Sequence, residues 1–149
     1  MEKAQLNTTY ALLILGISFL MLVGVFAGSE LYKGATAKNT ANALGEAILG
    51  KALVTIAEMK VTVNSTTRYA GDVKNFTRTF EIPTTIGDQR YLLAGRNSIL
   101  EFRTLGKPQV IASTNITLVW ENATIDGASG SSAGKVVISF IGPGRLRLS

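Results

Sequence analysis

The chain has 149 residues, which is enough for one domain with an appended segment but not for two full domains. It contains no histidine and no cysteine, which excludes disulfides, thiol chemistry, thiolate metal sites and most catalysis by proton shuttling. Its net charge of +5 comes from scattered Lys and Arg with no run of five or six, so a nucleic-acid partner is not expected.

The first expected element is a helix that is apolar on every side. Residues 4–29 carry no charge, and Lys3 and Glu30 close the two ends of this segment. Residues 10–27 suffice to cross a hydrocarbon core of roughly 30 Å at about 1.5 Å per residue. A soluble core helix of that length would show a polar stripe, and none is present. We therefore predict a helix that spans a membrane or forms the core of a filament.

Two alternatives to this interpretation are a buried helix of a soluble protein and a secretory signal peptide. A signal peptide has a shorter apolar region followed by a fresh mature terminus. Here the apolar stretch is long for that role, and the residues after it keep helical character.

The helical pattern continues beyond the apolar segment. Apolar residues recur every three or four positions through residues 30–59 and define one apolar face over residues 44–59. No proline interrupts this stretch, although Gly34 and Gly50 each weaken a helix by about 1 kcal/mol and allow a kink or break. We predict one long helix over residues 5–59.

From residue 60 the pattern changes to a period of two, which is typical of β-strands. Gly-, Asn- and Asp-containing turn signals separate the strand patterns, and Gly142-Pro143-Gly144 predicts a hairpin. The tract 126–134 has no bulky side chain and predicts a flexible loop. The alternating segments lie at 60–64, 77–82, 98–104, 110–120, 135–141 and 145–149.

These patterns predict a β-domain over residues 60–149 with five to seven antiparallel strands. A sheet of this size needs its apolar face covered, and the helix face over 44–59 is the available cover. The expected fold class is therefore α+β, with a long N-terminal hydrophobic helix packed on a small C-terminal antiparallel sheet.

Five of the eight asparagines begin an Asn-x-Ser/Thr triplet, the acceptor pattern for N-glycosylation. Asn7 would lie at the membrane and be a poor acceptor. The other four predict N-glycans on a β-domain outside the cell: Asn64, Asn75, Asn115 and Asn122. The alternative is that Thr-rich strands produce such triplets by chance.

The sequence offers no catalytic motif. No pair of acids forms a recognisable acid/base arrangement, no Ser-x-x-Lys occurs, and neither a phosphate-binding loop nor a dinucleotide fingerprint is present. We expect neither an enzyme nor a bound metal or cofactor.

The N-terminus resembles the archaeal class III signal-peptide family, the type IV pilin-like proteins. A short charged leader is followed by Ala4 and Gln5, the hydrophobic helix starts at once, and Tyr10 stands five residues after Gln5. The resemblance implies a leader over residues 1–4 that a prepilin peptidase cleaves between Ala4 and Gln5. Later segments are similar to the family's short strands and terminal hairpin, namely 80–83, 97–102, 134–140 and 142–148.

The resemblance implies a structural subunit of a surface filament for adhesion or cell contact. Identical subunits would assemble with the pilus machinery after insertion into the cytoplasmic membrane. The helical core would contain Tyr10, Leu12, Leu13, Leu15, Gly16, Phe19, Leu20, Leu22, Gly24 and Phe26.

The sequence departs from the family at one position. The family usually has Glu just before that Tyr, where the acid pairs with the terminal amine of a neighbouring subunit, and Thr9 stands here. Two alternatives therefore remain open. One is a single-pass, membrane-anchored extracellular binding domain that does not polymerise. The other is a minor pilin of a pilus or secretion machine.

Overall fold

The computed structural model describes the backbone of residues 2–70, 75–86, 88–107 and 109–149, and their side chains except those of 2–13 and 68–70. One helix, α1 (Glu2–Ala70), precedes a seven-stranded sheet. The chain divides into two compact units, Met1–Thr36 and Ala37–Ser149, and the division falls inside α1. The strands are β1 (Phe76–Glu81), β2 (Tyr91–Arg96), β3 (Ile99–Thr104), β4 (Ile111–Asn115), β5 (Thr124–Gly130), β6 (Lys135–Gly142) and β7 (Arg145–Leu148).

The helix is longer than the sequence pattern predicted. It is continuous through Gly34 and Gly50, and it ends at Ala70 rather than at residue 59, so the strand expected over 60–64 is wrong. In this β-prone stretch the threonine hydroxyls bond back to the helix, since Thr62 Oγ1 donates to the Glu58 carbonyl at 2.9 Å and Thr66 Oγ1 to the Thr62 carbonyl at 2.8 Å. Such bonds satisfy the hydroxyl groups but do not by themselves favour a helix.

Tertiary contacts also hold this last part of α1. Val63 is partly buried against the core, and Lys60 Nζ donates to the Val119 carbonyl at 3.1 Å. Packing against the sheet therefore overrides the intrinsic preference of Lys60–Asn64 for a strand.

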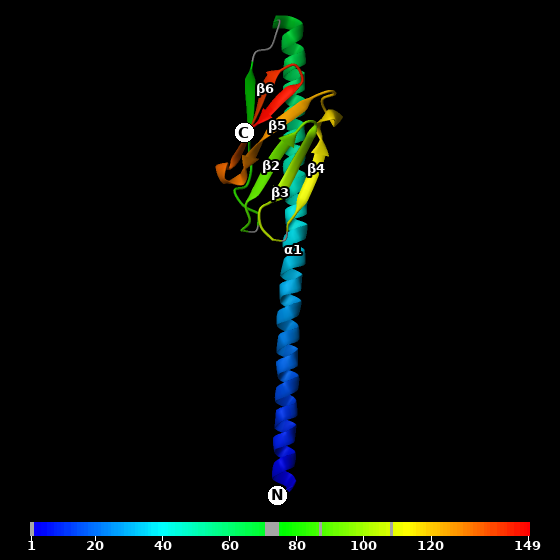
Figure 1. Cartoon of the computed structure of the whole chain (residues 1–149), viewed down its shortest axis with the longest axis vertical. Coiled ribbons are helices and arrows are strands. Elements are labelled where there is room, and N and C mark those ends of the chain that lie inside the picture. Colours follow the sequence, from blue (N-terminus) through cyan, green and yellow to red (C-terminus); the bar gives the residue numbers. More distant parts are fainter. Residues whose placement is uncertain (1, 71–74, 87, 108) are drawn as a thin grey trace. The chain divides into compact units, whose positions relative to one another are not determined.

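The sheet order is β1-β6-β7-β5-β2-β3-β4 (Figure 1). All neighbouring strands are antiparallel except β5 and β7, which are parallel. The predicted hairpin is confirmed, because β6 and β7 pair around Pro143 and Gly144, and Gly144 has a φ of 64° that favours glycine.

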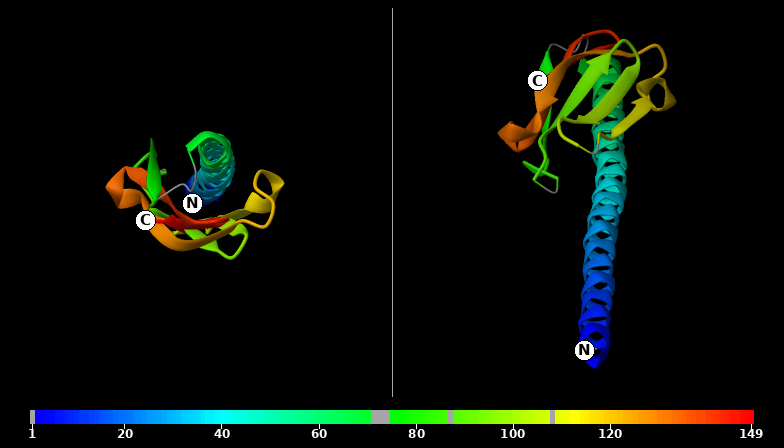
Figure 2. Two further views of the ribbon diagram at one scale, coloured as in Figure 1. Left: turned by 90° about the horizontal axis from the view of Figure 1, so that it is seen from above. Right: turned by 60° about the horizontal axis from the view of Figure 1, so that its bottom comes forward.

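The core of the C-terminal unit lies between α1 and one face of the sheet. Seen from above in Figure 2, the sheet curves around the helix and turns its concave face toward it. The helix contributes Ala41, Ile48, Leu49, Ala52, Ile56 and Met59, and the sheet contributes residues such as Phe80, Leu93, Phe102, Ile138 and Leu146. The prediction that the apolar helix face covers the sheet is confirmed, and the fold class is α+β.

The tract 126–134, predicted as a flexible loop, forms most of β5 and the 3-10 turn Ser131–Ala133. Strand β5 lies inside the sheet, hydrogen-bonded to β2 on one side and to β7 on the other. A Cβ on Gly127 would lie 2.2 Å from the Leu148 carbonyl oxygen, so small residues allow the close approach of β7. The loop prediction failed because these partners supply the hydrogen bonds that the tract's own composition does not predict.

The alternating segment 110–120 is likewise only partly a strand. After β4 the chain turns into the 3-10 helix Ile116–Leu118, whose N-cap is Asn115. The Asn115 side chain accepts a hydrogen bond from the Thr117 amide, which satisfies a donor at the start of this turn.

Candidate functional site

The most unusual surface is the apolar part of α1 in the N-terminal unit. We call residues 14–26 the apolar segment. Ten large apolar side chains there are between 48% and 71% exposed: Ile14, Leu15, Ile17, Phe19, Leu20, Met21, Leu22, Val23, Val25 and Phe26. By length and composition, α1 is the kind of helix that can cross a membrane.

Leaving this segment in water is costly. Full burial of one side chain of this size contributes about 1.5–3 kcal/mol. Since about half to two-thirds of each of the ten is exposed, covering them all amounts to roughly 10–20 kcal/mol. Soluble monomers seldom expose so many contiguous apolar groups, and such surfaces mark sites of contact with protein or membrane. The segment therefore requires an apolar environment that the described residues of the chain do not provide.

Five of the predicted filament-core side chains belong to this exposed set: Leu15, Phe19, Leu20, Leu22 and Phe26. The side chains of Tyr10, Leu12 and Leu13, like those of the predicted cleavage residues Ala4 and Gln5, lie outside the described part of the chain.

The glycines within the segment and just after it face open space. A Cβ on Gly16, Gly24 or Gly28 would meet no atom within 4 Å, whereas one on Gly45 would lie 2.7 Å from the Phe102 ring. Packing within the chain thus explains Gly45 but none of the other three. The absence of side chains at Gly24 and Gly28 leaves the helix backbone accessible to a closely packed neighbouring helix.

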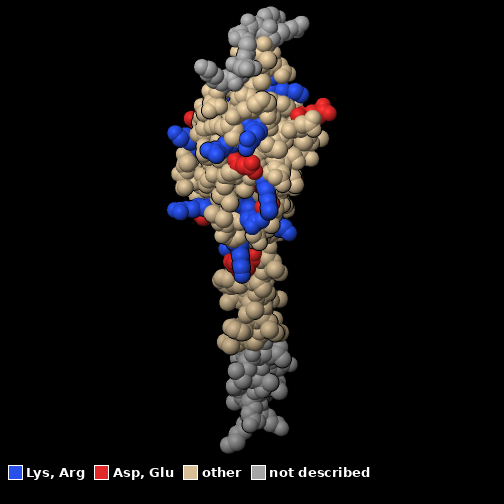
Figure 3. Space-filling view, turned by 45° about the horizontal axis from the view of Figure 1, so that its top comes forward, with Lys and Arg blue, Asp and Glu red and all other residues tan. Residues whose placement is uncertain are grey.

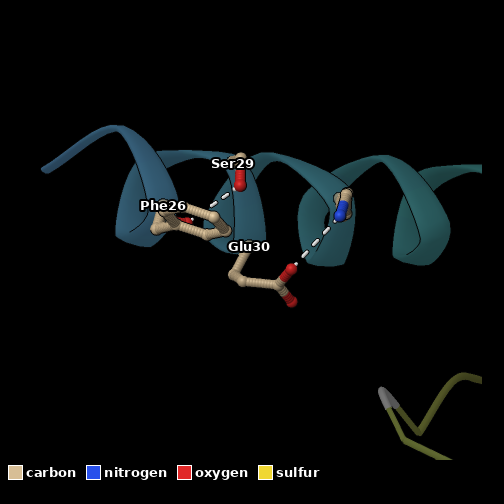
Figure 4. Close-up of polar contacts among 4 residues, drawn as sticks. Phe26, Ser29 and Glu30 are labelled. Carbon is tan, nitrogen blue, oxygen red and sulfur yellow. Dashed lines mark hydrogen bonds and ion pairs between the residues drawn. The ribbon is translucent and has the colours of Figure 1, made fainter. Parts of the chain in front are cut away.

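Polar side chains begin at Ser29, just after the apolar segment, as Figure 4 shows. Ser29 Oγ donates to the Phe26 carbonyl at 2.9 Å, and Lys33 Nζ lies 3.2 Å from Glu30 Oε1. Both charged side chains are 72% exposed, so the pair adds little stability and instead marks where solvated surface begins.

Charged side chains gather on the C-terminal unit. In Figure 3 Lys, Arg, Asp and Glu are spread over this unit, while the first described turns of α1 are free of them. Among the described residues only two ion pairs occur, and the second joins Arg103 to Glu101 at 2.7 Å on β3. This distribution is typical of a solvated domain rather than of a localised charged site.

All four predicted glycan acceptors lie in the C-terminal unit and are exposed. Asn64 lies on α1, Asn75 immediately precedes β1, Asn115 is the last residue of β4, and Asn122 lies in the turn before β5 with a φ of 59°. Exposure is a requirement for modification, and each of the four meets it.

The acceptor triplets differ in local geometry. Asn115 Oδ1 accepts from the Thr117 amide at 3.0 Å and from Thr117 Oγ1 at 2.8 Å, so the first and third residues of this triplet contact each other. On α1, by contrast, the Thr66 hydroxyl donates to the helix backbone instead of to Asn64.

The polar aromatic side chains of the core, Tyr91 and Trp120, are buried and make structural contacts. Burial raises the pKa of the Tyr91 phenol to about 12, and its hydroxyl donates to the Pro83 carbonyl. Trp120 is buried and stacks on Phe140 with ring centroids 6.0 Å apart. Within the described residues no cluster of three or more acids, histidines or cysteines could hold a metal ion.

Comparison of the chain with family models, with curated proteins and with solved structures finds no match. The apolar segment and the exposed surface of the β-domain are therefore the features that bear on function.

Proposed function

We propose that the chain is a structural subunit of an archaeal type IV pilus-like surface filament, used for adhesion or cell contact. The observation that carries this proposal is the apolar segment, whose ten exposed side chains are not covered by any described part of the chain. The residues around Ala4 and Gln5, which resemble a prepilin peptidase site, support it.

Two environments satisfy such a segment equally well. A helix that is apolar on all sides is stable in lipid, where its backbone groups are hydrogen-bonded internally, and in a bundle of its own copies. Transfer from membrane to filament core replaces one apolar environment with another and so costs little free energy. Membrane insertion before assembly is therefore part of the proposal.

Open glycines support packing between helices of different subunits. Gly24 and Gly28 are four residues apart and lie on one side of α1, where close helix approach becomes possible. Contacts that are heterologous and do not close produce open helical polymers. In such a polymer the β-domains form the outer layer and carry N-glycans at Asn64, Asn75, Asn115 and Asn122.

A second candidate is a single-pass extracellular domain that stays in the membrane and does not polymerise. The observation in its favour is Thr9, which stands where the pilin family has the acid that pairs with a neighbouring subunit. A minor pilin that primes a pilus or secretion machine differs from a major subunit in abundance rather than in sequence.

Electron microscopy of material sheared from native cells, labelled with an antibody to the β-domain, separates these candidates. Labelled thin filaments along their whole length support the major structural subunit. Label confined to the cell envelope contradicts the filament proposal and supports the anchored domain, whereas label at filament ends only indicates a minor subunit.

A further inference from the structure

In the part of the chain that the structure describes, the sheet has two open edges, since β1 pairs only with β6 and β4 only with β3. Along an antiparallel strand, the backbone groups of successive residues point alternately to the two sides. The Val110 carbonyl accepts from the Thr104 amide at 3.0 Å, and the Ile116 amide donates to the Ser98 carbonyl at 2.9 Å. The backbone groups of both residues therefore point toward the β3 side. The amides and carbonyls of residues 111, 113 and 115 therefore face the open side of β4.

Such an edge accepts a strand from another chain unless something blocks it. The usual devices are proline, a charged side chain, a bulge or a covering element. Residues Ile111–Asn115 contain no proline and no charge, and their register with β3 is unbroken. The side chain of Ile111 is also 54% exposed, so this edge is both open and partly apolar.

The opposite edge is partly covered by α1. The Ile82 amide donates to the Gly134 carbonyl at 3.0 Å, so residues 77, 79 and 81 present their backbone groups to the open side of β1. Lys51 Nζ donates to the Glu81 carbonyl at 3.0 Å and occupies one of these positions. Thr77 and Thr79 have no comparable cover among the described residues.

Two of the four acceptor triplets lie at these edges, whereas Asn64 lies on α1 and Asn122 precedes the inner strand β5. Asn75 lies one residue before β1, and Asn115 is the final residue of β4, whereas none of the five inner strands carries an acceptor asparagine. We propose that N-glycans at Asn75 and Asn115 shield the two open sheet edges and prevent strand addition between β-domains, so that subunits associate through α1. This inference rests on the proposed glycosylation.

The geometry at Asn115 suits this role. Its side chain is exposed, and the two hydrogen bonds from Thr117 hold the carboxamide oxygen at the end of β4. Glycan transfer joins the Asn115 nitrogen to the anomeric carbon of a lipid-phosphate-linked sugar. The bond from that carbon to the phosphate breaks, the amide loses one proton, and the lipid phosphate leaves. A bulky hydrophilic chain attached there hinders approach to the edge.

Threonine substitutions test the inference, because serine keeps the acceptor triplet and valine destroys it. The full chain is expressed in its native host and purified in detergent as wild type, Thr117→Val, Thr117→Ser, Thr77→Val and Thr77→Ser. Thr124→Val removes the Asn122 triplet away from both edges and serves as the positional control. Mass spectrometry measures glycan occupancy, sedimentation measures association, and Trp120 fluorescence reports folding.

We expect Thr117→Val and Thr77→Val each to lose one glycan and to raise the associated fraction several-fold. Thr124→Val should lose its glycan but sediment like wild type, and the serine variants should match wild type in both measurements. Adding Ser113→Lys to Thr117→Val places a charge on the β4 edge and should reverse the association. If Thr117→Val and Thr77→Val lose the glycan and sediment like wild type, the inference is overturned and the glycosylation proposal stands. An unmodified wild-type chain instead overturns the glycosylation proposal and the inference with it.

Discussion

Two stretches of α1 have the same backbone conformation and opposite surroundings. Between residues 14 and 26 every described side chain is exposed, and between residues 41 and 59 a stripe of apolar side chains is buried against the sheet. The difference follows from the sequence pattern, because the first stretch is apolar on all sides and the second on one face only. A one-sided pattern is satisfied within the chain, whereas an all-round pattern requires lipid or other copies of the helix.

The largest expected effect comes from a charge in the apolar segment. Leu15→Lys should abolish any surface filament and weaken membrane insertion, because a charged side chain in the middle of such a helix costs about 3 kcal/mol or more in lipid. Membrane fractionation and electron microscopy of cells expressing the variant measure both outcomes.

The matched control places the same charge on the second stretch. Ala47 is an exposed position of α1 in the C-terminal unit, and Ala47→Lys should insert into the membrane like the wild type. Normal insertion and filaments from Leu15→Lys would contradict the assignment of residues 14–26 to an apolar environment.

Glycine substitutions compare the two stretches at a smaller scale. Gly45→Ala places a methyl group 2.7 Å from the Phe102 ring, and such overpacking costs about 1–3 kcal/mol, against a gain of about 1 kcal/mol in helix propensity. We expect a net loss of up to about 2 kcal/mol in the stability of the C-terminal unit, measured by unfolding with Trp120 fluorescence. Gly24→Ala meets no atom within 4 Å and should leave that transition unchanged. Equal effects of the two variants would mean that the stretches do not differ in packing.

The last effect is visible only above pH 10 and concerns the burial of Tyr91 in the sheet core. The pKa of Tyr91 is raised to about 12 in the folded chain from its usual value near 10, so the folded state holds this proton more tightly than the unfolded state. The resulting stability is complete below pH 10 and is lost as the pH rises through 12. An ultraviolet titration of wild type against Tyr91→Phe should show one phenol that ionises only near pH 12. Ionisation of Tyr91 near pH 10 in the folded chain would contradict the burial of this phenol in the core.

Much of the C-terminal unit could be predicted from local patterns. Alternation identified most of the strands, and three- to four-residue spacing placed the helix face that covers them. The errors fall where tertiary contacts decide the outcome. Lys60–Asn64 alternates like a strand but is helical because Lys60 and Val63 contact the β-domain. Asn115 interrupts the alternating segment 110–120 by capping a 3-10 turn.

For the candidate site, the sequence predicted the exposed apolar set and the exposed acceptor asparagines. It did not indicate that Asn75 and Asn115 lie at opposite edges of one sheet. Strand order depends on long-range pairing, which a local pattern does not contain. The hydrogen bond from Lys51 Nζ to the Glu81 carbonyl was not predicted for the same reason, since the two residues lie thirty positions apart in the sequence.

The sequence by itself determined that residues 4–29 form a charge-free helix in need of an apolar environment, because hydropathy and helical period are local properties. Only the tertiary structure decided that the Gly- and Ser-rich tract 126–134 forms an inner strand. A tract with few side chains carries little local preference, and its conformation is set by the hydrogen bonds and close approach of β2 and β7 on either side.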